Sequence, residues 1–180
     1  ANDTDYTRVS KRLDLVNFAD YCLLNAYVAM GDWPANNWRA GRERSTNGIW
    51  RYIAWDCEWA MGIYSLPVTR DSFAFSGSGT EDAGLNSTST SEIARTYQAL
   101  RANREFRLLL ADRIQKHFFQ GGALTGANIS NRFDQLRRDL LGVIPSMDTE
   151  ILTWARDRLP IIMTQFNTYG LYGYSNALYG

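Results

Sequence analysis

The stretch GDWPANNWRA, residues 31–40, separates an apolar segment from a segment with strand-like alternation. It places Asp32, Pro34 and the adjacent pair Asn36 and Asn37 close together. Proline and asparagine favour tight turns, while the carboxylate and the two amides supply polar groups at defined positions. This composition predicts a loop that holds polar side chains in place, rather than a simple connection.

A helix is predicted immediately before this loop. The run LDLVNFADYCLLNAYVAM, residues 13–30, is apolar on most faces, and Asp14 stands where a helix N-cap is expected. Gly31 follows the run and is a natural helix stop. We therefore predict a buried helix that ends directly at the polar loop.

A β-hairpin is predicted after the loop. The segments NWRAGRER and IWRYIAW flank STNG, and the second segment alternates as a pleated strand requires. Asn47 and Gly48 favour a tight turn with positive φ. The second strand then leads into WDCEWAMG, where Asp56 and Glu58 are two residues apart.

The second half of the chain is predicted to be helical. SEIARTYQALRAN and REFRLLLADRIQKHFFQ carry apolar residues at helical spacing, and Gly121 ends the second of them. Thr125 precedes another helical segment that Pro145 stops, and Pro160 is expected to kink or divide the last helix. Residues 65–90, rich in Gly, Ser and Thr, are predicted to be a flexible insertion. These patterns predict an α+β fold that is mainly α.

Length and composition narrow the classes of protein. The chain has 180 residues, 45% of them hydrophobic, which suits a single domain. Its formal net charge of zero gives no electrostatic reason to expect nucleic acid as a partner. No apolar run is long enough to span a bilayer. Cys22 and Cys57 lack CxxC spacing and His117 is the single histidine, so no zinc or multi-histidine site is predicted.

The chemistry is expected to come from the polar loop and the end of the hairpin. Asp32 and Asn37 have the spacing DxxxxN, with which protein kinases place a catalytic aspartate and a metal-binding asparagine. In kinases a short hairpin then delivers a second aspartate that binds magnesium, and Asp56 follows in that order. Asp56 and Glu58 point to the same side if the segment is extended. This order predicts a metal-dependent phosphotransferase site, because hard cations take oxygen ligands.

Other roles remain open for the same residues. Asp32 can cap amides of a local turn, and Asp56 and Glu58 can form ion pairs with Arg39 or Arg51. Glycoside hydrolases also use two carboxylates near aromatic side chains, here Glu58 with Asp32 or Asp56. A pseudokinase or surface scaffold, which keeps the fold without catalysis, is a third alternative.

The motifs resemble the CotH (spore coat protein H) kinase family, atypical secreted protein kinases with a divergent kinase-like fold. The resemblance implies a kinase-like large lobe with a small hairpin next to the catalytic loop, ATP as phosphate donor, and Mg or Mn as cofactor. It assigns Asp32 to catalysis, Asn37 and Asp56 to the metal-bound nucleotide, and Glu58 to a further metal ligand. The matching stretches are NFADYCLLNAYVAMGDWPANNW, WRYIAWDCEWAMG, LRANREFRLLLADRIQKHFFQGGALT and FNTYGLYG.

The sequence departs from the kinase pattern in one respect. No glycine-rich phosphate loop is present, and neither Lys11 nor Lys116 lies in a VAIK-like strand. We therefore expect residues 1–180 to be a single domain, a fragment of a CotH kinase domain that lacks the nucleotide-clamping small lobe and binds nucleotide weakly by itself. The resemblance also implies a bacterial protein that is secreted or lies on the cell surface or spore coat, with a protein substrate or coat protein as partner.

Overall fold

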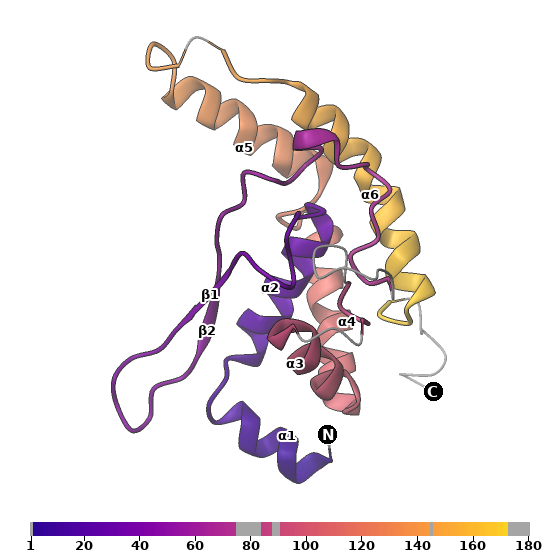
Figure 1. Ribbon diagram of the computed structural model, residues 1–180. Coiled ribbons are helices and arrows are strands. Elements are labelled where there is room, and N and C mark those ends of the chain that lie inside the picture. The colour runs from indigo at the N-terminus through magenta and orange to yellow at the C-terminus, as the bar shows by residue number, and fades with distance from the viewer. Residues whose placement is uncertain (1, 75–83, 88–90, 145, 173–180) are drawn as a thin grey trace.

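The computed structural model describes residues 2–74, 84–87, 91–144 and 146–172 (Figure 1). Within these ranges the fold is mainly helical, with one two-stranded antiparallel sheet, so the predicted α+β class is confirmed. None of the helices in this part of the chain is long and apolar enough to cross a membrane. The elements are α1 (Asp3–Ser10), α2 (Leu15–Tyr27), β1 (Trp38–Gly41), β2 (Arg51–Ala54), the short 3-10 helix η1 (Ile63–Ser65), α3 (Glu92–Arg101), α4 (Arg104–Phe118), α5 (Gly126–Asp139) and α6 (Glu150–Thr168).

Helix α2 is the central helix of the fold. It packs against α4, α6 and β2, which explains why its sequence is apolar on most faces. Asp14 is its N-cap, as predicted, and accepts a hydrogen bond from the Asn17 backbone N–H at 3.0 Å. The helix begins after Leu13 because Leu13 forms a β-bridge with Trp50 of the hairpin. Helix α2 ends at Tyr27 rather than at the predicted stop, Gly31, and residues 28–30 lead into the polar loop. Ala29 in this connection has positive φ, 51°.

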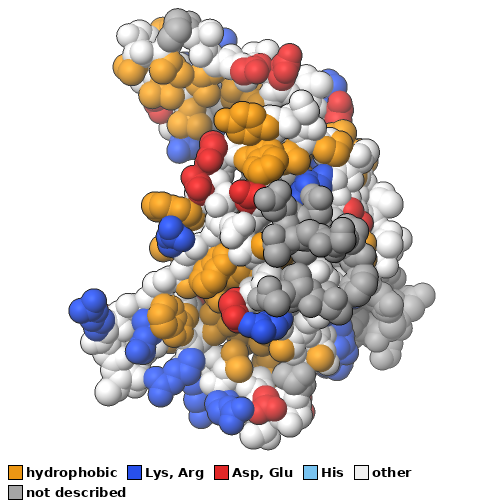
Figure 2. All heavy atoms as spheres, in the orientation of Figure 1, with side chains coloured by type: hydrophobic (Ala, Val, Ile, Leu, Met, Phe, Trp, Pro, Cys, Tyr) orange, Lys and Arg blue, Asp and Glu red, His pale blue; other side chains and the backbone are white. Residues whose placement is uncertain are grey.

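Strands β1 and β2 form a hairpin that projects from the body of the molecule (Figure 1). Trp38 pairs with Ala54 and Gly41 with Arg51, so the connection between the strands is longer than a two-residue turn. The prediction of positive φ at Asn47 and Gly48 is wrong, since neither residue adopts it. Basic side chains gather at the lower left of Figure 2, where the hairpin and α1 lie.

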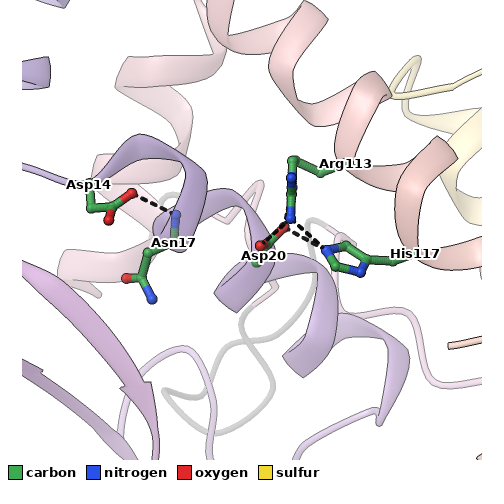
Figure 3. A network of polar contacts seen from close by, with 5 residues as sticks. All are labelled: Asp14, Asn17, Asp20, Arg113 and His117. Carbon is green, nitrogen blue, oxygen red and sulfur yellow. Dashed lines mark hydrogen bonds and ion pairs between the residues drawn. The ribbon is translucent and has the colours of Figure 1, made fainter. Parts of the chain in front are cut away.

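An ion-pair cluster ties α2 to α4 (Figure 3). Arg113 donates from Nε and Nη2 to the two carboxylate oxygens of Asp20, at 2.6 and 2.7 Å. The Nε2 atom of His117 lies 2.9 Å from Asp20 Oδ1 and 3.0 Å from Arg113 Nη2. Such a bidentate, partly buried pair is stronger than an exposed one. The cluster fixes the central helix against α4 and gives His117 a structural role.

Helix α6 crosses the molecule without a division at Pro160. Arg158 of this helix is fully buried and donates to the carbonyls of Ala26 and Tyr27, at 2.7 and 3.0 Å. Its Nη1 atom donates to the carbonyls of Val68 and Arg70. The carbonyls at the end of α2 have no partner within the helix, and the Arg158 cation satisfies two of them. Burial lowers the pKa of Arg158 to about 10. Arg158 therefore joins α2, α6 and the segment after η1.

Part of the segment 65–90 is packed into the core. Phe73 and Leu85 are fully buried, and the Asn86 side chain donates to the Phe73 carbonyl at 2.7 Å. The predicted flexibility stays a prediction for residues 75–83 and 88–90, which lie outside the described residues. The described part of the segment contributes core side chains.

Helix α5 stands apart from the other helices and packs mainly against α6 (Figure 1). Phe133 is its buried residue. Thr125 occupies the N-cap position that the sequence predicts, but its side chain makes no capping hydrogen bond to the helix. Helix α5 and the first half of α6 therefore form an arm, the α5–α6 arm, while the second half of α6 packs in the core through Ile162 and Phe166.

Candidate functional site

The polar loop is joined to the segment after the hairpin through the backbone. The Gly31 N–H donates to the Trp59 carbonyl at 2.7 Å, and the Met61 N–H donates to the Val28 carbonyl at 2.8 Å. A Cβ atom at Gly31 would lie 2.4 Å from the Trp59 ring, so only glycine fits this close approach. Asp32 and Glu58 are the sequence neighbours of the bonded residues Gly31 and Trp59. The structure thus places the two predicted parts of the site side by side.

Two buried contacts hold the middle of the loop. Trp33 is 1% exposed, and its Nε1 atom donates to the Tyr21 hydroxyl at 2.9 Å. The Pro34 carbonyl accepts a hydrogen bond from the Ser91 hydroxyl at 2.6 Å, and the Trp33–Pro34 peptide bond is cis. Trp33 is therefore a core residue rather than part of an exposed aromatic platform, and Asp32 is held close to a rigid anchor.

Asp32 and Asn37 line the same surface hollow, which has a volume of about 630 Å³. Both residues are half-buried and both have positive φ, 55° and 50°. Asp and Asn tolerate this backbone conformation better than most residues, and it is enriched at functional sites. Within the described ranges, no hydrogen bond or ion pair involves the Asp32 carboxylate. The hollow is lined by Asp32, Ala35, Asn36, Asn37, Trp38, Arg39 and Ala40.

Asp56 and Glu58 are exposed and do not line this hollow. Asp56 also has positive φ, 57°. The ladder that pairs Trp38 with Ala54 brings Asn37 and Asp56 to the same end of the hairpin, because each lies just beyond a strand terminus there. The structure therefore brings Asp32 and Asn37 together in one hollow and leaves Asp56 and Glu58 at its side.

The alternative of ion pairs with Arg39 or Arg51 is not found. Arg51 instead forms an ion pair with Asp14, with Nε 3.0 Å from Oδ2. The Arg39 guanidinium lies over the Trp55 ring, 4.9 Å from its centroid. In the described part of the chain, no ion pair or hydrogen bond involves the carboxylates of Asp56 and Glu58. These carboxylates face solvent and are accessible to a cation.

The pKa of Cys57 is affected by the carboxylates on either side of it. Partial burial raises the pKa of the Cys57 thiol, and the adjacent carboxylates of Glu58 and Asp56 raise it further. Burial is the larger cause, and the two carboxylates add a negative potential that disfavours the thiolate. The same potential attracts cations.

The donor set suits a hard cation, although no preformed cage exists among the residues that the structure describes. Carboxylate oxygens of Asp32, Asp56 and Glu58 and the amide oxygen of Asn37 are ligands of the kind that Mg²⁺ and Mn²⁺ prefer. In the described ranges, however, no group of three or more His, Cys, Asp or Glu side chains is arranged to hold a metal ion. Mg²⁺ sites in phosphotransferases commonly use one or two carboxylates together with substrate phosphates. The residues therefore fit a metal that arrives with a phosphate ligand.

Sequence reasoning missed the residues that support the site. Asn17 contacts the hairpin, Ser91 contacts the loop and Arg158 holds the end of α2, but no motif marks these three side chains. Trp59 lies in the predicted segment WDCEWAMG, whereas its bond to Gly31 does not follow from the sequence. A polar residue inside an apolar helical run, such as Asn17 in LDLVNF, is the one available signal, because a buried amide needs a partner. The partner itself depends on tertiary packing.

A comparison with models of protein families shows to which family the chain belongs. The model described as CotH kinase protein matches residues 1–166. The chain belongs to the CotH kinase family. No curated protein and no solved structure matches it significantly. The CotH assignment that the sequence motifs suggested is therefore confirmed, and the match covers the loop, the hairpin and α6 as far as Phe166.

Proposed function

We propose that this CotH family member is a metal-dependent phosphotransferase that transfers phosphate from ATP to a protein hydroxyl. The observation that carries the proposal is the hollow shared by Asp32 and Asn37, which lie at the kinase spacing DxxxxN. Family membership supports a kinase-like function in general. It also supports a kinase-like large lobe as the description of the fold.

The proposed roles follow from accessibility and chemistry. Asp32 orients the acceptor hydroxyl and accepts its proton, because its half-buried carboxylate opens into the hollow and has no hydrogen-bond or ion-pair partner in the described ranges. Asn37 and Asp56 provide oxygen ligands for Mg²⁺ or Mn²⁺, with Glu58 as a further ligand. A bound divalent cation would neutralise charge on the ATP phosphates. The backbone hydrogen bond from Gly31 to Trp59 holds the loop that carries Asp32 beside the segment that carries Glu58.

A non-catalytic scaffold is the second candidate. The observation that favours it is the exposure of Asp56 and Glu58 together with the lack of a preformed acidic cluster in the described ranges. A pseudokinase keeps the fold and its binding surfaces while metal affinity is lost. The proposed location on a cell surface or spore coat, with a coat protein as partner, suits both candidates. A glycoside hydrolase gains no support from Trp33, which is buried, although Trp55 beside Asp56 is exposed.

Titration calorimetry tests the proposal in the full-length natural protein. Mg²⁺ and ATP should bind together, and transfer of labelled phosphate to a protein should depend on the metal. Asp56→Ala should abolish both signals with an unchanged melting temperature, because the Asp56 carboxylate makes no hydrogen bond or ion pair in the described ranges. Asp32→Asn should lower turnover and keep nucleotide affinity. A folded protein that binds neither metal nor ATP would favour the scaffold instead.

A further inference from the structure

A large groove lies between the α5–α6 arm and the segment 61–68. Its volume is about 1060 Å³, at the upper end of the range for sites that hold drug-sized ligands, so it has room for several side chains. Leu136 and Ile144 line it and remain at least one-third exposed. Leu141 and Val143, in the connection after α5, are 82% and 77% exposed. Apolar surface of this extent on an arm indicates an interaction site.

The charged residues that line this groove are acidic, although Arg137 and Arg138 line the adjoining hollow. Asp148, Glu150 and Asp157 lie along it, and no Lys or Arg is among its lining residues in the described ranges. The Asp148 side chain accepts from the Glu150 N–H, and Asp157 contacts Arg156. Glu150 has no hydrogen-bond or ion-pair partner for its carboxylate in the part of the chain described. The groove therefore suits an apolar segment that carries basic residues.

The hairpin of the same chain has the complementary composition. Residues 38–55 contain four arginines and a single acidic residue, Glu43. The four large apolar side chains at its tip and along its second strand are all more than one-third exposed. The outer edge of β2 is held by the body, because Trp50 exchanges backbone hydrogen bonds with Arg12 and Asp14, whereas β1 pairs with no strand other than β2 in the described ranges. The arginines are Arg39, Arg42, Arg44 and Arg51, and the exposed apolar residues are Ile49, Trp50, Ile53 and Trp55.

The hairpin and the groove of one molecule lie far apart. In Figure 1 the hairpin loop extends downward from the body, whereas α5 and the start of α6 are at the opposite end. In Figure 2 basic side chains gather over the hairpin end. A chain therefore cannot insert its hairpin into its own groove.

We propose that the hairpin of one copy docks into the α5–α6 groove of a second copy. Burial of Ile49, Trp50 and Ile53 against the apolar groove would provide the stabilisation, since apolar area removed from water drives association. Arg42 and Arg44 at the tip would face Glu150 and Asp157, which gives the contact its orientation.

This contact joins two different surfaces and is therefore heterologous. Each pair leaves one hairpin and one groove unused at its ends. Further copies can add until the rotation between neighbours closes a ring, or without limit if it does not close. Neither surface includes Asp32, Asn37, Asp56 or Glu58, although Arg39 at the base of the hairpin also lines the hollow of the candidate site. The substituted residues Arg42, Arg44, Glu150 and Asp157 lie outside that hollow, so the self-association can be tested separately from phosphotransfer.

Sedimentation velocity on the natural protein tests this association. The average mass should increase with protein concentration and fall in high salt, because salt shortens the Debye length from about 10 Å at 0.1 M to about 3 Å at 1 M. The variants Arg42→Glu/Arg44→Glu and Glu150→Lys/Asp157→Lys should each remain monomeric. Two controls carry the same charge changes on α3 and α4, Arg95→Glu/Arg104→Glu and Glu92→Lys/Glu105→Lys, and should associate normally.

Mixing the two monomeric variants gives the decisive result. The hairpin variant keeps an intact groove and the groove variant keeps an intact hairpin, and the two altered surfaces carry opposite charges. An equimolar mixture should therefore associate, although each variant alone stays monomeric. Circular dichroism of each variant establishes that it is folded. Natural protein that stays monomeric at every concentration would overturn the proposal. So would a groove variant that still dimerises alone, since that result would require a symmetric contact.

Discussion

The side chain of Asn17 pairs with the backbone of Tyr52 in both directions. Its Oδ1 atom accepts from the Tyr52 N–H at 2.6 Å, and its Nδ2 atom donates to the Tyr52 carbonyl at 3.1 Å. The Asn17 amide thus makes the two hydrogen bonds that a neighbouring strand would make to Tyr52 on the outer edge of β2. Because α2 leads to Asp32 and β2 leads to Asp56, this pair fixes the relative position of the two halves of the site.

Replacement of Asn17 by Ala should destabilise the protein by about 1–3 kcal/mol, because two partly buried backbone groups of Tyr52 lose their partners. Urea denaturation measures the change. Asn167→Ala, on the exposed face of α6, is a matched control and should have little effect. Equal stabilities for the two variants would show that water replaces the amide at no cost.

Replacement of Gly31 by Ala should disturb the site through Trp59. The added Cβ would fall 2.4 to 2.8 Å from three ring atoms, so the ring or the loop must move, with an expected cost of about 1–3 kcal/mol. Gly126→Ala in α5, where a Cβ meets no atom within 4 Å, is the control and should be neutral or stabilising. Thermal unfolding compares them. A stable Gly31→Ala variant would contradict the close approach.

The Asp14 N-cap of α2 should make the free energy of unfolding depend on pH in the acidic range. The pKa of Asp14 is lowered from 3.8, mainly by the hydrogen bond from the Asn17 N–H and further by Arg51, against the opposing effect of burial. A lowered folded-state pKa means that the stabilisation is fully present above pH 3.8 and is lost as the pH falls through the lower folded value. Asp14→Ala should cost about 0.5–2 kcal/mol at neutral pH and much less in strong acid. Denaturation at both pH values checks the difference.

Cys57 offers a measure of metal binding that does not depend on activity. Burial raises the pKa of its thiol, and the Glu58 and Asp56 carboxylates raise it further. Asp56→Asn/Glu58→Gln should remove the second contribution, lower that pKa and speed alkylation at neutral pH. Mg²⁺ with ATP should have the same effect on the natural protein and none on the variant. Cys22 is fully buried and should not react in the folded state. A rate unaffected by the metal would place the metal away from Asp56.

The helices of the second half and α2 could be predicted from local patterns, because residues that favour helix ends stand at or near several of their termini. Asp14 and Thr125 occupy N-cap positions, and Gly121, with φ 80°, lies just beyond α4. Helix α1 was not predicted, because most of its side chains are polar and none of its residues is buried. The hairpin was predicted from strand alternation, whereas its turn was not, since Gly48 lies against the Glu43 carbonyl instead of in a two-residue turn.

The order of the candidate site residues could also be predicted, since Asp32 and Asn37 share a loop and Asp56 follows the hairpin. The contacts that hold these residues in place could not be predicted. Arg158 lies far along the chain from the α2 carbonyls that it binds, and the Gly31–Trp59 bond depends on how two loops pack. Contacts between distant segments leave no periodic pattern, so only the three-dimensional fold reveals them.

The attachment of α5 to α6 has a consequence for local unfolding. Phe133 is the buried residue of α5, and Ile129 in its first turn packs against the core. The part of the helix that follows Ile129 can therefore separate from α6 while the core around α2 stays intact. Its amide protons should then exchange through a sub-global opening that requires less free energy than global unfolding. The arm would behave as a separate cooperative unit, and any partner that fills the groove beside it would slow that exchange.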